Sequence, residues 1–156
     1  MATSSFYRIR KKERNFELAN TIVVIVSLFN IIASAYGVVS YLYNYYVYYN
    51  QRSHFSEKVL GSLSDFLPIR FFVAYVICLI LAISICVLSI RNFLLVKNGK
   101  SVYHLQAYLG VAYIVTTVFR DISFGWNLYG LIFPTFYALI YCMSYLTAKQ
   151  VNQLND

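Results

Sequence analysis

The sequence is poor in charged residues, and long stretches of it contain none. Only 12% of its 156 residues are Asp, Glu, Lys or Arg, against about 25% in a typical soluble domain. Four stretches have no charged residue at all: 18–51, 71–90, 101–119 and 122–148. An α-helix needs about 20 apolar residues to cross the core of a bilayer. The missing charges therefore argue against a water-soluble domain and predict four membrane spans.

Residues that commonly bind metals or haem are also scarce. The two histidines, His54 and His104, are expected on opposite sides of the membrane, which argues against paired haem ligands. Cys78, Cys86 and Cys142 all fall in charge-free stretches and form no CxxC pair, so we interpret them as small packing residues. The sequence contains neither an HExxH motif nor a nucleophile elbow. We therefore expect no metal and no cofactor.

One group of residues after the first span has a composition suited to catalysis. His54 and Glu57 are three residues apart and would share a face of an outer helix, and Asp65 follows them. Such a group can begin an acid–base or metal site. Because this loop has no second histidine and the sequence has no nucleophile motif, a solvated loop is the simpler interpretation. We expect the protein not to be an enzyme.

The distribution of basic residues predicts the orientation in the membrane. With both termini inside, nine of the 13 Lys and Arg residues lie inside and four outside, as the positive-inside rule favours. We therefore expect an all-α integral membrane protein, an antiparallel bundle of four transmembrane helices, in the inner membrane if the source is bacterial. The basic residues favour contact with anionic lipid at the cytoplasmic face. Nucleic acid is not expected as a partner, because there is no separate basic domain.

The predicted organisation is one membrane domain, 18–148, with short ends. Residues 1–17 form a basic cytoplasmic segment, 43–68 an outer loop and 149–156 a cytoplasmic tail. The spans are expected at 18–42, 69–92, 102–120 and 127–148. Residues 33–35 resemble a signal-peptide cleavage site. Because the apolar stretch continues well past them, we expect an uncleaved first span.

The first charge-free stretch is longer than a bilayer requires. Its 34 residues would form a helix of about 50 Å. We expect the helix to leave the lipid near Tyr41 and to continue outward as an aromatic stalk, followed by a short amphipathic helix within 51–68. Tyrosine suits the membrane–water interface, and the candidate interfacial residues are Tyr41, Tyr43, Tyr45, Tyr46, Tyr48 and Tyr49.

Small side chains recur every fourth residue in the second and fourth spans. Residues four apart share one helix face, and small side chains let helices approach closely in lipid. We expect these stripes to form helix-packing interfaces, within the bundle or between subunits. They are Ala74, Cys78, Ala82 and Cys86 in one span, and Gly130, Pro134, Ala138 and Cys142 in the other. Pro134 should also bend its helix, as a static kink or as a gating hinge.

Several polar residues are expected at membrane depth. The hydroxyl of Tyr137 needs a hydrogen-bond partner there, and the candidates are Asn30, Thr116 and Thr117. These four residues form either a hydrogen bond within the bundle or part of a polar path. Gln106 and His104, near the inner end of the third span, are expected to extend to the membrane interface.

Three charged residues are expected together at the outer mouth of the bundle: Arg70, Arg120 and Asp121. Because Arg120 and Asp121 are consecutive, we expect their side chains to point in different directions. Pairing of Arg70 with Asp121, or of Arg120 with Asp65, would then tie the loops together. The alternative is that the two arginines attract anions or lipid headgroups.

By elimination, we expect a small non-enzymatic polytopic protein that acts as a homo-oligomer or as a subunit of a larger membrane assembly. A first alternative is a channel or transporter with a polar path near Asn30, Thr116 and Tyr137. It requires these side chains to face one cavity. A second alternative, a membrane-associated defence or immunity protein, rests only on analogy with other small proteins of this build.

Overall fold

The computed structural model is all-helical over the residues that it describes. These are 2–65, 67–123 and 129–155 for the backbone, and 9–51, 53–65, 67–122 and 132–154 for the side chains. The predicted all-α fold is thereby confirmed for this part of the chain. The elements are α1 (Ala2–Asn50), a 3-10 turn η1 (Arg52–His54), α2 (Glu57–Ser64), α3 (Ile69–Lys97), α4 (Leu105–Ser123) and α5 (Tyr129–Asn155).

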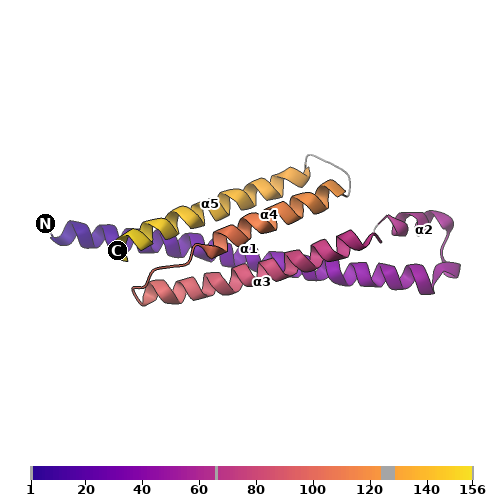
Figure 1. Cartoon of the computed structure of the whole chain (residues 1–156), viewed down its shortest axis with the longest axis horizontal. Helices are drawn as coiled ribbons and strands as arrows, with labels where there is room; N and C mark the ends of the chain where they lie inside the picture. Colours follow the sequence, from indigo (N-terminus) through magenta and orange to yellow (C-terminus); the bar gives the residue numbers. More distant parts are fainter. Residues whose placement is uncertain (1, 66, 124–128, 156) are drawn as a thin grey trace.

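Four long helices run antiparallel to their neighbours along the chain (Figure 1). α1 packs on α3 and α5, and α4 also packs on α3 and α5, so the four form a ring. Both termini lie at one end of the bundle, which we call the terminal end, and α2 lies at the other, the α2 end (Figure 1). Two of the helices, α1 and α3, are long and apolar enough to cross a membrane.

α1 extends well beyond the predicted first span at both ends. Its 49 residues correspond to about 74 Å of helix. It begins at Ala2, so the basic segment is also helical. Phe16, within this segment, is fully buried. Phe16 belongs to an apolar cluster that also contains Val96, Val102, Ala148 and Val151. At its other end α1 reaches past the α4–α5 hairpin and lies beside α3 and α2 (Figure 1).

The loop after α1 contains the short outer helix that the spacing of apolar residues predicts. This helix, α2, has no buried residue. The loop is tied back to α1 by Tyr41, whose hydroxyl donates to the carbonyl oxygen of Leu67 at 2.7 Å. Phe66, one of the apolar residues on which the prediction rested, lies outside the described residues.

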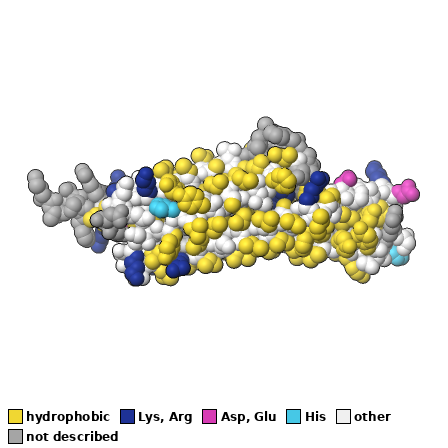
Figure 2. Space-filling model, viewed as in Figure 1, with side chains coloured by type: hydrophobic (Ala, Val, Ile, Leu, Met, Phe, Trp, Pro, Cys, Tyr) yellow, Lys and Arg dark blue, Asp and Glu magenta, His cyan; other side chains and the backbone are white. Residues whose placement is uncertain are grey.

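Polar side chains occupy much of the interior, and large apolar ones cover the surface. Asn20, Ser27 and Gln106 are at most 1% exposed, whereas Phe29 and Ile32 are 69% and 67% exposed. A water-soluble bundle shows the opposite distribution. Figure 2 shows hydrophobic side chains along the middle of one face, with most of the visible Lys and Arg near the terminal end. This surface suits contact with lipid hydrocarbon.

Candidate functional site

Five polar side chains from all four long helices form a buried cluster near the terminal end. None of them is more than 1% exposed. We call this group the terminal cluster: Asn20 of α1, Ser89 and Asn92 of α3, Gln106 of α4 and Ser144 of α5. Asn20 also reaches across to α3, where its Nδ2 donates to the carbonyl oxygen of Ser89 at 2.7 Å.

Gln106 is the centre of the terminal cluster. Its Nε2 donates to Asn20 Oδ1 at 3.1 Å and to Ser144 Oγ at 2.5 Å. Its Oε1 accepts from Ser89 Oγ at 3.2 Å and from Asn92 Nδ2 at 2.9 Å. These bonds use both donors and both acceptor positions of the amide. The expectation that Gln106 extends to the membrane interface was therefore wrong, because partners on three other helices converge on it.

Two asparagine side chains hold the segment between α3 and α4. Asn92 Oδ1 accepts from the Tyr103 N–H, and Asn92 Nδ2 donates to the Tyr103 carbonyl oxygen, both at 2.9 Å. Asn152 of α5 pairs in the same way with the backbone of Val102, at 2.7 and 3.0 Å. These amides supply the partners that a non-helical backbone lacks. Asn152 Nδ2 also lies 3.1 Å from Nε2 of His104, which is half-buried.

An apolar layer fills the middle of the bundle. Its members are Val23, Cys78, Ala82, Ile85, Tyr113, Ile140 and Tyr141. Along the helices, this layer lies between the terminal cluster and the polar residues nearer the α2 end. Close approach of α4 and α5 here requires Gly110, because a Cβ at that position would overlap the Tyr141 ring.

Nearer the α2 end, residues of α1, α4 and α5 line a pocket of about 280 Å³. We call it the Asn30 pocket, and its lining includes Asn30, Ser34, Tyr113, Thr117, Arg120, Asp121, Pro134 and Tyr137. The Tyr137 hydroxyl donates to Asn30 Oδ1 at 2.9 Å. Asn30 Nδ2 is buried and has no hydrogen-bond partner. One residue of the pocket lining therefore has an unused hydrogen-bond donor.

Arg120 and Asp121 form an ion pair in the wall of this pocket. Nη2 and Nε of Arg120 both lie 2.8 Å from Asp121 Oδ1. The expectation that these side chains point in different directions was wrong, because the long arginine side chain folds back onto the neighbouring carboxylate. Its guanidinium carbon lies 5.2 Å from the centre of the Tyr75 ring, a cation–π contact. Arg70, by contrast, is exposed and lies over the ring of Phe71.

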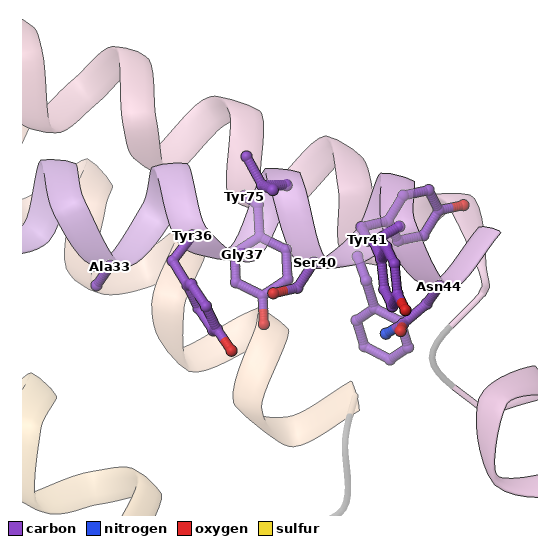
Figure 3. A pocket seen from close by; sticks show the side chains of 10 residues that line it. Ala33, Tyr36, Gly37, Ser40, Tyr41, Asn44 and Tyr75 are labelled. Carbon is purple, nitrogen blue, oxygen red and sulfur yellow. The ribbon is translucent and has the colours of Figure 1, made fainter. Parts of the chain in front are cut away.

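The position of Tyr75 depends on a glycine in α1. A Cβ at Gly37 would overlap the Tyr75 ring, and Figure 3 shows this ring beside Gly37. Both residues line an open groove of about 670 Å³ along α1, together with Tyr36, Tyr41 and Asn44 (Figure 3). Ala33 lines both the groove and the Asn30 pocket, so the two are adjacent.

Of the predicted polar path, three residues line the Asn30 pocket and one does not. Asn30, Thr117 and Tyr137 belong to the pocket. Thr116 instead donates its hydroxyl to the carbonyl oxygen of Ala112 at 2.9 Å, on its own helix. The polar groups are thus brought together in part, at the α2 side of the apolar layer.

The two small-residue stripes lie in different surroundings. The α3 stripe is at most 7% exposed and packs inside the bundle: Ala74, Cys78, Ala82 and Cys86. In α5, Pro134 is buried within the helix, whereas Ala138 and Cys142 are exposed. Gly130 belongs to α5 but lies outside the described side chains. Ala138 and Cys142 line an apolar groove of about 280 Å³ between α4 and α5.

The tyrosine rings at the far end of α1 contact one another. Tyr41 is buried, and its ring lies 6.4 Å from that of Tyr45, which in turn lies 4.5 Å from that of Tyr49. Tyr48 lies 5.2 Å from Tyr49, and Tyr43, Tyr45, Tyr46 and Tyr49 are exposed. These contacts build a continuous aromatic surface along the helix.

The candidate catalytic residues of the loop are exposed and spread along it. His54 belongs to η1, and Glu57 and Asp65 lie at opposite ends of α2, about 12 Å apart along its axis. This separation weighs against a shared catalytic site. Among the described residues, no group of three His, Cys, Asp or Glu side chains is arranged to hold a metal ion.

Comparison with known proteins provides no relative. No protein-family model matches the chain, and neither a curated protein nor a solved structure is significantly similar to it. The functional argument therefore depends on the geometry described above.

Proposed function

We propose that this chain is a non-enzymatic protein with four membrane spans that works within an assembly of subunits. The supporting observation is that large apolar side chains are exposed on all four long helices: Phe29 of α1, Ile80 of α3, Val115 of α4 and Leu139 of α5. Such a surface would drive association in water but suits lipid. In α4, the polar Gln106 and the Arg120–Asp121 pair are turned into the bundle, so this helix also presents apolar residues outward.

The proposed orientation places the terminal end in the cytoplasm. Reporter fusions at exposed positions test it. Gly99 lies in the turn after α3 with φ +62°, and Gly61 lies in α2 with nothing near its Cα. A reporter that is active only in the cytoplasm should be active after Gly99 and after Asp156, and inactive after Gly61. Equal activity at Gly99 and Gly61 would contradict the orientation.

The groove between α4 and α5 supports contact with another copy of the chain. Small side chains, Ala107, Ala138 and Cys142, line it together with the larger Tyr108 and Tyr145, whose rings lie 6.4 Å apart. Small residues permit close helix packing where the hydrophobic effect contributes little. The groove is therefore the proposed subunit interface, and an unlike membrane subunit is the alternative occupant.

Native mass spectrometry of the protein in nanodiscs tests this interface. The wild type is expected as a multimer, and Ala138→Leu should weaken association at least tenfold by filling the groove. Ala112→Leu is the matched control, because Ala112 is also exposed but does not line the groove. Identical mass distributions for the three proteins would contradict the proposed interface. A monomer bound to unlike chains would instead favour the accessory-subunit form.

A channel or transporter is the second candidate, supported by the common pocket of Asn30, Thr117 and Tyr137. The apolar layer of Val23 and Tyr141 lies between this pocket and the terminal cluster, which favours binding over conduction through one copy. Ion or solute flux into proteoliposomes that is reduced by Asn30→Leu would favour this candidate. No feature of the described residues bears on a defence or immunity role.

A further inference from the structure

The Asn30 pocket has the features of a binding site that the assembly role does not use. Asn30 is only 3% exposed, it belongs to the lining of the pocket, and its buried Nδ2 has no hydrogen-bond partner. A buried donor that lacks a partner is unfavourable, and native structures contain few of them. A ligand with an acceptor group at this position would pair the amide.

The charges in the pocket wall restrict what such a ligand can be. The ion pair joins two guanidinium nitrogens of Arg120 to a single carboxylate oxygen of Asp121. Because a guanidinium has five N–H donors, this arrangement leaves donors for a further anionic group. An anion alone would be repelled by Asp121, and a cation alone by Arg120. A ligand with both charges can gain from both residues.

Aromatic rings complete the site. The Tyr113 and Tyr137 rings meet edge to face, with centroids 5.8 Å apart and planes at 74°. Ring faces of this kind attract ammonium groups. Phe133, which is exposed, also lines the pocket.

We propose that the Asn30 pocket binds a small zwitterion. Its anionic group accepts hydrogen bonds from Arg120 and Asn30 Nδ2, and its ammonium group lies beside Asp121 and the tyrosine rings. A volume of about 280 Å³ matches a group of amino-acid size and is just below the range for drug-sized ligands. A free amino acid and a zwitterionic lipid headgroup share this chemistry, and the groove along α1 is adjacent to the pocket, since Ala33 lines both. This binding does not depend on the proposed assembly role.

Thermal unfolding of the full-length protein tests the proposal with three probes that share the alanine skeleton. The protein is held in nanodiscs of phosphatidylglycerol, and the probes are L-alanine, the anion N-acetyl-L-alanine and the cation L-alanine methyl ester. Alanine should raise the unfolding midpoint and half-saturate at a concentration at least tenfold lower than either analogue.

A second arm of the experiment replaces part of the phosphatidylglycerol by phosphatidylethanolamine. A higher midpoint in that lipid, lost in Asn30→Leu, assigns the site to a headgroup. No preference for a zwitterion in either arm overturns the proposal.

Two variants separate binding from folding. Asn30→Leu should abolish the response, whereas Asn15→Leu, at an exposed position of the same helix, should leave it unchanged. Asp121→Asn removes only the negative charge, so it should reverse the preference and make N-acetyl-L-alanine bind better than alanine. A purely structural role for Asp121 would not change the order of the probes. An unchanged order in this variant, or an unchanged response in Asn30→Leu, overturns the proposal.

Discussion

The bundle contains two buried polar clusters, and they use the same residue types differently. In the terminal cluster, all four hydrogen-bonding positions of the Gln106 amide are filled by side chains of the other helices. In the Asn30 pocket, Asn30 has one partner, Tyr137, and its buried Nδ2 is unpaired. A saturated amide has no bond to offer a ligand, whereas an unsaturated one does. The first cluster therefore joins helices, and the second is suited to binding.

The buried environment increases the difference in stability contribution between the terminal cluster and the Asn30 pocket. In a low-dielectric interior, a complete hydrogen-bond network is strengthened and an incomplete one is penalised. Changes to the terminal cluster should therefore reduce stability strongly. Changes at Asn30 should affect binding more than folding.

The largest effect is expected for Gln106→Leu. This substitution leaves buried groups of Asn20, Asn92 and Ser144 without their partner, and each orphaned group costs about 1–3 kcal/mol. We expect a loss of at least about 3 kcal/mol in the free energy of unfolding, measured by SDS titration with circular dichroism. Gln150→Leu, at an exposed position of α5, is the control and should change little. Equal stability of the two variants would show that the cluster does not join the helices.

The apolar layer between the two clusters is tested by Gly110→Ala. The added Cβ would overlap the ring of Tyr141, which is only 2% exposed and has little room to move. Overpacking of this kind costs about 1–3 kcal/mol, so we expect about 2 kcal/mol in the same assay. Gly61→Ala has no atom near the new Cβ and should be neutral or slightly stabilising. A neutral Gly110→Ala would indicate that α4 and α5 pack less closely than described.

The same substitution at Asn20 and at Asn30 compares the clusters directly. Asn20 takes part in two bonds, to Ser89 and Gln106, so Asn20→Leu should cost about 2 kcal/mol. Asn30→Leu removes one bond but also one unpaired donor, and should cost less than about 1 kcal/mol. Unfolding of the two variants in one experiment measures the difference. The reverse order would overturn the assignment of structural and binding roles.

The smallest effect is expected for Tyr137→Phe. It removes the hydrogen bond to Asn30 Oδ1 and leaves that one oxygen without a partner, which should cost about 1 kcal/mol, the low end for an orphaned group. The exposed Tyr43 provides the control Tyr43→Phe, for which we expect no change in the unfolding midpoint. A loss of several kcal/mol at Tyr137 would mean that this bond joins helices as strongly as Gln106 does.

The sequence predicted the helices better than it predicted their polar contacts. Charge-free stretches predict the long helices because the energy of placing charge in lipid restricts where charges occur. The N-terminal part of α1 was not predicted, because the surrounding basic residues obscured Phe16, a buried apolar side chain that anchors it. Asn30 was among the predicted partners of Tyr137, since both are polar residues at similar depth in their spans.

Other contacts depend on information that spacing does not contain. The partner of Asn152 is the backbone of Val102, fifty positions away, and no sequence pattern marks a backbone as a partner. Gln106 was assigned to the interface because it follows the charged turn after α3 closely. The sequence did contain a signal for the terminal cluster, because α1, α3, α4 and α5 each have a polar residue near the charged end of the helix that lies at the terminal end. The pairing of Arg120 with Asp121 depends on the side-chain rotamer of Arg120. The position of a residue on a helix does not determine its rotamer.

The central place of Gln106 has consequences for the biosynthesis of the chain. Synthesis proceeds from the N-terminus, so α1 and α3 pair before Gln106 emerges. Until then, Asn20 Nδ2 can pair with the Ser89 carbonyl oxygen, but Asn20 Oδ1 lacks its donor. Gln106 must in turn wait for Ser144. Of the four long helices, α5 leaves the ribosome last and thus completes the network. Nascent chains that stop before α5 should carry unpaired amides in lipid, which marks them for retention by insertion factors or for degradation.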